Sequence, residues 1–291
     1  MQKMPPIPLN LDIELSAVCN LQCPTCFVPT QDHRKNVVNS FMPFDLAMRL
    51  ITEAKNIGIP AVKFNWRGEP TLHQEFTKIM QFAVRGKVFY DILINTNGNC
   101  PDKSIEGLKY TTKCMFSVDT LNKELYAKMR KRGGIRTVIE TIRRVVEMGH
   151  DNVWVRRIIT DVNKKEDFKE MVRVIFGDGY VKVSEHYCFD RSKKYDGRHR
   201  PTRTYCGYPS QRLVVATDGK VFACCVDYDE KYQVGDVYHQ SLLEIWHGSR
   251  MNELRENLRN DLANDMELCK TCTSFMSYVD ARRDHVQDRE L

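Results

Sequence analysis

Residues 11–26 read "LDIELSAVCNLQCPTC" and join an apolar, strand-like run to three closely spaced thiols. Cys19, Cys23 and Cys26 lie on the segment that follows this run. A structural zinc ion takes four protein ligands, whereas three thiolates can hold a cubane iron–sulfur cluster and leave one iron open. The stretch therefore predicts a metal-binding loop after the first strand, with an iron–sulfur cluster favoured and zinc as the alternative.

The composition is that of a globular protein with one large core or two smaller ones, because 42% of the 291 residues are hydrophobic and 28% are charged. No apolar run approaches the roughly 20 residues needed to cross a bilayer. The start "MQKMPPIPLN" has neither an apolar core nor a cleavage site for secretion. The 11 cysteines are an odd count, which favours metal ligands and reduced thiols over disulfides. We therefore expect a cytoplasmic protein with no membrane segment.

Strand-like runs alternate with amphipathic segments as far as residue 187. The runs are "LDIEL", "AVKFNW", "DILINT", "CMFSVD", "NVWVRRII" and "YVKVSEHY". Segments between them, such as "PFDLAMRLITEAKNIG", "QEFTKIMQFAV" and "IRTVIETIRRVVEMG", have helical periodicity and end near Gly or a polar turn. Such a series with right-handed crossovers predicts an α/β fold, a partial (β/α)6 TIM-like barrel over residues 1–190. Reactive groups then belong at the carboxyl ends of the strands.

The net charge of +6 is concentrated in one segment. Residues 191–204 contain six Lys or Arg and a single acidic residue, Asp196, so they carry +5 and the remaining residues carry +1. We interpret this segment as a solvated basic linker, with a specific anion-binding role as the alternative. No stacking motif or nucleic-acid-binding module accompanies it, so we do not expect a nucleic-acid partner.

Polar motifs follow three of the predicted strands. The second run leads into "WRGEPTL" with Gly68 and Glu69, and the third ends in "NTNG", which begins with Asn95. The fourth carries Ser117 and Asp119, which we expect on one face of the strand because they are two residues apart. An ordinary turn would explain "NTNG" alone. The shared position of the motifs at strand ends favours a ligand site.

These motifs, with the C-x3-C-x2-C spacing of Cys19, Cys23 and Cys26, resemble the radical S-adenosylmethionine (SAM) superfamily over nearly the whole chain. The resemblance implies a [4Fe-4S] cluster on the three cysteines and a SAM molecule that yields a 5'-deoxyadenosyl radical. It implies that Gly68 lets the backbone approach SAM and that Glu69 binds its ammonium group. The residues implied for the ribose or the methionyl end are Asn95, Ser117 and Asp119.

The carboxylate of SAM requires a cation, preferably an arginine that can bind it through two hydrogen bonds. The family pattern favours Arg130 in "YAKMRKRGG" and Arg156 in "VWVRRIIT". Two alternatives stay open on the sequence alone. Arg130 belongs to a basic run typical of a solvated surface, and either Arg156 or Arg157 must point away from the barrel interior.

A second set of cysteines follows the basic linker. The segment "RLVVATDGKVFACC" predicts a β-hairpin with its turn at Asp218-Gly219, bracketed by Cys206 and Cys224. "SLLEIWHGSRMNELRENLR" predicts one amphipathic helix that returns the chain to Cys269 and Cys272. Three other thiols are expected to be small packing residues: Cys100, Cys114 and Cys188.

This arrangement over residues 205–291 is similar to the twitch domain, a shortened relative of the SPASM domain. The similarity implies one auxiliary [4Fe-4S] cluster on Cys206, Cys224, Cys269 and Cys272, and two [4Fe-4S] clusters in total. Structural zinc is the alternative for these four cysteines. Cys225 adjoins this set and is a candidate hydrogen-atom donor.

The resemblance is closest in pattern to aminocyclitol dehydrogenase-type members. It implies an oxidoreductase that removes hydrogen from a small polar substrate, such as a sugar or aminocyclitol, and passes an electron to the auxiliary cluster. A flavodoxin or ferredoxin would supply the reducing electron. The first strand begins near Leu11, which leaves no room for a leader-peptide domain and favours a small metabolite over a peptide. Three alternatives remain: an epimerase that uses Cys225, a peptide maturase, and a non-catalytic iron–sulfur or zinc protein.

Overall fold

Parallel strands form at the positions of the predicted runs. The computed structural model describes residues 5–26, 28–29, 40–187, 206–260 and 262–270. The barrel strands are β1 (Asn10–Ile13), β2 (Ala61–Lys63), β3 (Asp91–Thr96), β4 (Lys113–Ser117), β5 (Val153–Ile159) and β6 (Lys182–Tyr187). Each pairs in parallel with the next, as in Leu11 with Val62 and Val62 with Ile92. The prediction of a partial TIM-like barrel is confirmed.

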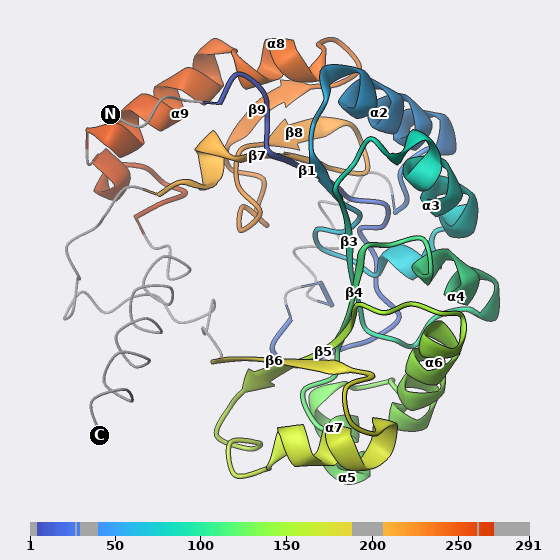
Figure 1. Cartoon of the computed structure of the whole chain (residues 1–291). Helices are drawn as coiled ribbons and strands as arrows, with labels where there is room; N and C mark the ends of the chain where they lie inside the picture. The colour runs from blue at the N-terminus through green and yellow to red at the C-terminus, as the bar shows by residue number, and fades with distance from the viewer. Residues whose placement is uncertain (1–4, 27, 30–39, 188–205, 261, 271–291) are drawn as a thin grey trace.

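Helices cover the outer face of this curved sheet (Figure 1). They are α2 (Phe44–Ile57), α3 (Phe76–Val84), α4 (Asp102–Leu108), α5 (Lys123–Met129), α6 (Ile135–Glu147) and α7 (Phe168–Phe176). In α6 the buried residues include Val138, Ile142 and Val145, which recur at helical spacing and pack into the main core. This apolar stripe fixes the helix against the sheet.

The two faces of the barrel strands differ in chemistry. Leu11, Ile13 and Leu15 belong to the main core. Asp12 and Glu14 alternate with them, so they lie on the opposite, concave face of the sheet. The same alternation places Asn95, Ser117 and Arg156 on that face. The inner face therefore carries polar and charged side chains among apolar ones, and these can bind a polar ligand.

The chain after residue 205 extends the same sheet. It contains β7 (Arg212–Val215), β8 (Lys220–Phe222), β9 (Gln233–Asp236), α8 (Leu242–Trp246) and α9 (Ser249–Arg259). The predicted hairpin is confirmed as β7 and β8, which pair antiparallel. β7 also pairs in parallel with β1, with Leu213 opposite Leu11. The hairpin is therefore joined to the barrel by backbone hydrogen bonds.

The prediction of one continuous helix over residues 241–259 is wrong. The helix stops after Trp246 and restarts at Ser249, because Gly248 has an extended backbone with ψ of 157°. Arg255 stabilises the break by donating to the Trp246 carbonyl at 2.6 Å and packing over the Trp246 ring at 4.0 Å. β9 was not predicted.

The predicted basic linker, residues 191–204, lies outside the described residues, as do Cys188 and Cys272. The domain boundary placed there stays a prediction. Cys114 is fully buried and Cys100 packs against the main core, in agreement with packing roles for both. Within the described ranges, no helix is both long enough and apolar enough to cross a membrane.

Candidate functional site

The cysteine loop, residues 19–26, follows β1 and is shaped by backbone and side-chain contacts. The Gln22 N–H donates to the Lys131 carbonyl at 2.9 Å, which ties the loop to the segment after α5. The Cys19 sulfur accepts from the Leu21 N–H at 3.4 Å and from Asn97 Nδ2 at 3.5 Å. None of the described cysteines forms a disulfide. Three thiols on one short loop are the ligand type of an iron–sulfur cluster, although in the described part of the chain they do not converge on one position that could hold a single metal ion.

Burial favours the protonated form of Cys19 and Cys23 by raising the pKa of each thiol. Burial, with a smaller effect of the nearby Glu69 carboxylate, raises the pKa of Cys19 to about 12. Burial also raises the pKa of Cys23, and the Arg130 guanidinium partly opposes that rise. A metal or cluster that binds here must therefore displace protons from the thiols. Binding at this loop is expected to weaken at low pH.

Gly68 is required because its backbone approaches the segment before the cysteine loop. The Gly68 N–H donates to the Ser16 carbonyl at 3.1 Å, and the Glu69 N–H donates to the Val18 carbonyl at 2.9 Å. A Cβ atom at Gly68 would lie 2.4 Å from both carbonyl oxygens. No side chain fits at that distance, so only glycine allows this approach.

Glu69 connects the loops after β2 and β3. One carboxylate oxygen, Oε1, accepts from the Thr71 N–H and from the hydroxyls of Thr71 and Thr96, and Oε2 accepts from the Asn97 N–H at 2.7 Å. Burial raises the pKa of Glu69, and these donors oppose the rise. Oε1 already accepts three of these hydrogen bonds, so Oε2 is the better acceptor for a ligand cation.

The motif "NTNG" contributes a residue that the sequence analysis did not select. Asn95 lies on β3, and its backbone N–H donates to Asn65 Oδ1 at 3.2 Å. Asn97, two residues further, contacts the cysteine loop through Asn20 Oδ1 at 2.8 Å as well as through Cys19. The asparagine at the loop tip was visible in the sequence. Its contact with Cys19 depends on tertiary structure.

Ser117 and Asp119 do not share a strand face, so that prediction is wrong. β4 ends at Ser117, and Asp119 has a left-handed backbone with φ of 67°. The Asp119 carboxylate accepts from the Ile158 N–H at 2.8 Å and forms an ion pair with Arg130, with Nη2 to Oδ2 at 2.7 Å. Asp119 therefore positions Arg130 beside the cysteine loop, where Arg130 Nη1 lies 3.9 Å from the Cys23 sulfur.

Arg156 and Arg157 point to opposite sides of β5. Arg157 pairs with Glu185 and packs over Phe168, a residue of the main core. Arg156 is opposite Ser117 in the sheet register, on the concave face. Its buried Nε has no hydrogen-bond partner among the described residues, and burial lowers its pKa. A half-buried guanidinium in this state favours an anionic ligand.

The second cysteine set lies around the hairpin. Cys206, Cys224 and Cys225 all act electrostatically on Tyr208, so the three thiols lie near one another. A hydrogen bond from Cys224, with smaller effects of Arg212 and Lys63, lowers the pKa of Cys225 to about 6. Cys269 follows η4 (Leu262–Asn264) and affects Tyr232. Across the described residues, no three His, Cys, Asp or Glu side chains are placed to hold a single metal ion.

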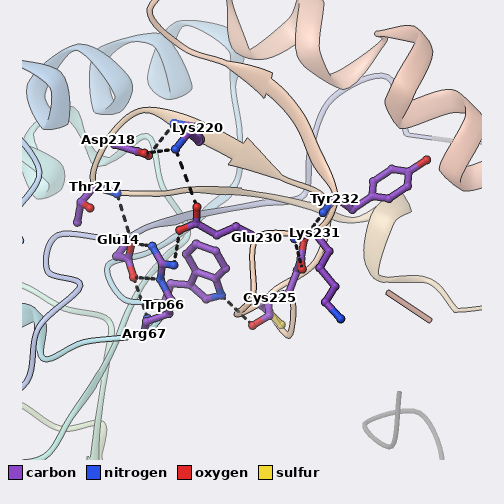
Figure 2. Close-up of polar contacts among 11 residues, drawn as sticks. Glu14, Trp66, Arg67, Thr217, Asp218, Lys220, Cys225, Glu230, Lys231 and Tyr232 are labelled. Atoms are coloured by element: carbon purple, nitrogen blue, oxygen red, sulfur yellow. Dashed lines mark hydrogen bonds and ion pairs between the residues drawn. The ribbon is translucent and has the colours of Figure 1, made fainter. Parts of the chain in front are cut away.

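Two residues missed from sequence connect this hairpin to the loop after β2 (Figure 2). Trp66 Nε1 donates to the Cys225 carbonyl at 2.9 Å. Arg67 forms ion pairs with Glu14 and Glu230. Neither residue type signals a ligand site by itself. Only their neighbours in "WRGEPTL" could have drawn attention to them.

Comparison with known proteins agrees with this geometry. Residues 13–175 match the model of the radical SAM superfamily, and the chain belongs to that family. Residues 206–273 match SPASM, an iron–sulfur cluster-binding domain. The chain thus combines a radical SAM domain with a SPASM domain.

Particular relatives differ in what their names describe. A probable GTP 3',8-cyclase of Methanocaldococcus jannaschii is 29% identical over 57% of this chain and 55% of its own length. A SAM-dependent 2-deoxy-scyllo-inosamine dehydrogenase of Niallia circulans is 28% identical over 28% of this chain and 32% of its own length. The chain therefore matches about half or less of these two curated relatives.

Solved structures share the fold at low sequence identity. BtrN in complex with AdoMet and 2-DOIA aligns over 94% of each chain with a TM-score of 0.62 and 17% identity. Streptococcus suis SuiB bound to its precursor peptide SuiA aligns over 92% of this chain and 72% of its own, with a TM-score of 0.67 and 16% identity. These likenesses establish the architecture.

The cofactors of this family are SAM and iron–sulfur clusters, and the residues present fit them. The cysteine loop supplies three thiols without a disulfide, as the cluster that binds SAM requires. Glu69 and Arg156 supply an anion and a cation for the two charged groups of an amino acid. The SPASM region supplies further thiols at Cys206, Cys224 and Cys269.

Proposed function

We propose that the protein is a radical SAM oxidoreductase that oxidises a small polar substrate, such as a sugar or aminocyclitol, in the cytoplasm. The observation that carries the proposal is the contact between the second cysteine set and the loop that contains Gly68 and Glu69. Trp66, two residues before Gly68, donates to the carbonyl of Cys225, which adjoins Cys224. The auxiliary thiols thus belong to the same packed unit as the loop proposed to bind SAM.

We assign roles toward SAM to the polar residues that the sequence analysis selected. When bound to the loop cluster, SAM supplies a 5'-deoxyadenosyl radical. Glu69 binds the ammonium group, and Arg156 with Ser117 binds the carboxylate from the concave face. Asn95 lies one strand away on the same face and is proposed to contact the ribose. Asp119 holds Arg130, which neutralises negative charge near Cys23.

The oxidation must remove two electrons and two protons from a carbon that bears a hydroxyl group. One hydrogen atom leaves with the radical and forms 5'-deoxyadenosine. The hydroxyl proton is lost to solvent. Cys206, Cys224, Cys269 and Cys272 would hold one auxiliary [4Fe-4S] cluster, which would supply an acceptor for the remaining electron. A carbonyl group results. A flavodoxin or ferredoxin would take up the electron that the auxiliary cluster accepts, and that partner or a second one would supply the electron that cleaves SAM.

The test is anaerobic turnover of the reconstituted protein with SAM, dithionite and a panel of aminocyclitols, amino sugars and sugars. We expect substrate-dependent 5'-deoxyadenosine and a product two hydrogens lighter by mass spectrometry. GTP is included because several relatives are named for its cyclisation. The control is Cys19→Ala, which removes one ligand of the loop cluster. Absence of 5'-deoxyadenosine in the wild type would refute radical chemistry.

Two other reactions are tested by repeating the assay in deuterium oxide and with a supplied peptide. A product of unchanged formula that carries solvent deuterium, and is lost in Cys225→Ala, would establish an epimerase in which Cys225 donates hydrogen. Modification of a supplied peptide, with none of the small molecules consumed, would establish a peptide maturase. SuiB, bound in its structure to the peptide SuiA, shares the fold. Either result would replace the proposed oxidation.

A further inference from the structure

Arg67 is buried between two carboxylates from distant parts of the chain (Figure 2). Its side chain is 3% exposed. Nε and Nη2 donate to the two oxygens of Glu14 at 2.7 Å each, and Nη1 donates to Glu230 Oε1. The guanidinium also packs over the Trp66 ring at 4.1 Å. Arg67 thus connects the residue that follows β1 to the segment that follows Cys224 and Cys225.

Glu14 is fully buried and depends on these contacts. Burial raises its pKa, and the Arg67 guanidinium opposes that rise. The Thr217 N–H, in the turn between β7 and β8, also donates to Glu14 at 3.3 Å. Losing Arg67 would leave an uncompensated charge in the interior, which proteins tolerate poorly. The hairpin, the end of β1 and the loop after β2 are therefore held by one charge network.

The loop after β2 has little freedom to move independently of Arg67. The residue after Arg67 is Gly68, which packs against the Ser16 and Val18 carbonyls with no room for a Cβ atom. Glu69, proposed to bind the SAM ammonium group, follows directly. On the other side, Trp66 is fixed by the Cys225 carbonyl and by Phe222, whose ring centroid lies 5.2 Å away. A shift of Arg67 must therefore be transmitted to Gly68 and Glu69.

We propose that Arg67 is a positioning residue through which the auxiliary segment, residues 217–230, holds the SAM-binding loop, residues 66–69, in its binding geometry. The inference rests on the proposed function for the identity of the two ligands, SAM and the auxiliary cluster. It adds that the SAM site is completed by the second half of the chain. Glu230, more than 160 residues from Arg67 in sequence, controls SAM affinity without touching SAM.

The test is Glu230→Gln in the full chain carrying its clusters, because this variant keeps the Arg67–Glu14 pair. Asp229→Asn is the matched control, since the same chemical change falls one residue away on a carboxylate that is 78% exposed and lies 3.9 Å from Lys231. Hydrogen–deuterium exchange follows the backbone N–H groups of Gly68 and Glu69. Calorimetry measures the Kd of SAM.

We expect Glu230→Gln to speed exchange at Gly68 and Glu69 and to raise the Kd of SAM by about fivefold or more, the lower end of typical coupling between sites. Asp229→Asn should change neither. At saturating SAM, the rate of SAM cleavage by Glu230→Gln should stay near the wild-type rate, because Glu230 contacts no reacting atom. A merely destabilised protein would instead lose rate along with affinity.

The inference would be overturned if the two variants, Glu230→Gln and Asp229→Asn, had the same exchange rates at Gly68 and Glu69 and the same Kd for SAM. If Glu230→Gln does not fold, Trp66→Phe decides, because it removes the hydrogen bond to Cys225 and keeps an aromatic ring. It should also speed exchange at Gly68 and Glu69, and unchanged exchange would count against the coupling. The proposed function would be wrong if the wild type bound SAM and formed no 5'-deoxyadenosine. The exchange comparison would still test the role of Arg67 in that case.

Discussion

Replacing Glu69 by glutamine separates its proposed role toward SAM from its role in the fold. The glutamine keeps the shape of the side chain and one carbonyl oxygen for the donors of Thr71 and Thr96. Its amide NH2 group then faces the Asn97 N–H, which in the wild type donates to Glu69 Oε2 at 2.7 Å. One charge-assisted hydrogen bond is lost within the protein, which is expected to cost about 1.5–3 kcal/mol of unfolding free energy.

The same change removes the negative charge that we assign to the SAM ammonium group. A charge-assisted hydrogen bond is worth about 1.5–3 kcal/mol, which corresponds to a Kd for SAM raised about tenfold to a hundredfold. Because burial raises the pKa of Glu69, the carboxylate is protonated on acidification more readily than an exposed one. SAM affinity in the wild type should therefore fall as the pH is lowered, and this fall should be smaller in Glu69→Gln.

The measurement is calorimetric titration of SAM into the anaerobically reconstituted protein, with thermal unfolding recorded in parallel. Glu75→Gln is the control, because Glu75 is a partly exposed carboxylate six residues away that pairs with Lys78 at 2.7 Å. It should leave the Kd unchanged. A folded Glu69→Gln variant that binds SAM as tightly as the wild type would remove Glu69 from the SAM site.

Three further predictions follow from the described contacts. Alanine at all three thiols of the cysteine loop should abolish SAM cleavage and leave about four irons of an expected eight, counted by iron analysis; retention of eight would show that the ligands are wrongly assigned. Gly68→Ala should abolish measurable SAM binding, because its Cβ would lie 2.4 Å from the Ser16 carbonyl oxygen; normal binding would show that the loop can shift. Burial lowers the pKa of His150 from 6.5, so the unfolded chain binds the extra proton and stability should fall as the pH drops below about 6.5, by up to ~1.4 kcal/mol per pH unit. Thermal unfolding at several pH values should show a smaller dependence in His150→Gln, and an equal dependence would exclude this histidine as the cause.

Local pattern was enough to predict the barrel. Apolar residues at alternate positions of "DILINT" and at helical spacing in residues 135–149 each bury one side, and a βα repeat admits few topologies. The cysteine loop and Gly68-Glu69 could be placed for the same reason, because both directly follow predicted strands and the carboxyl ends of parallel strands meet at one edge. Here the position of the candidate site follows from short-range sequence and a general rule of topology.

The sequence by itself could not decide which contacts join residues that are far apart in the chain. Whether Arg156 or Arg157 faces the interior depends on the register of β5, and the pairing of Asp119 with Arg130 depends on a left-handed backbone beyond the strand. The network of Glu14, Arg67 and Glu230 exists only because β7 pairs with β1 and brings the hairpin against the loop after β2. Buried charges acquire their partners from packing, and packing across 160 or more residues leaves no periodic signal in the sequence.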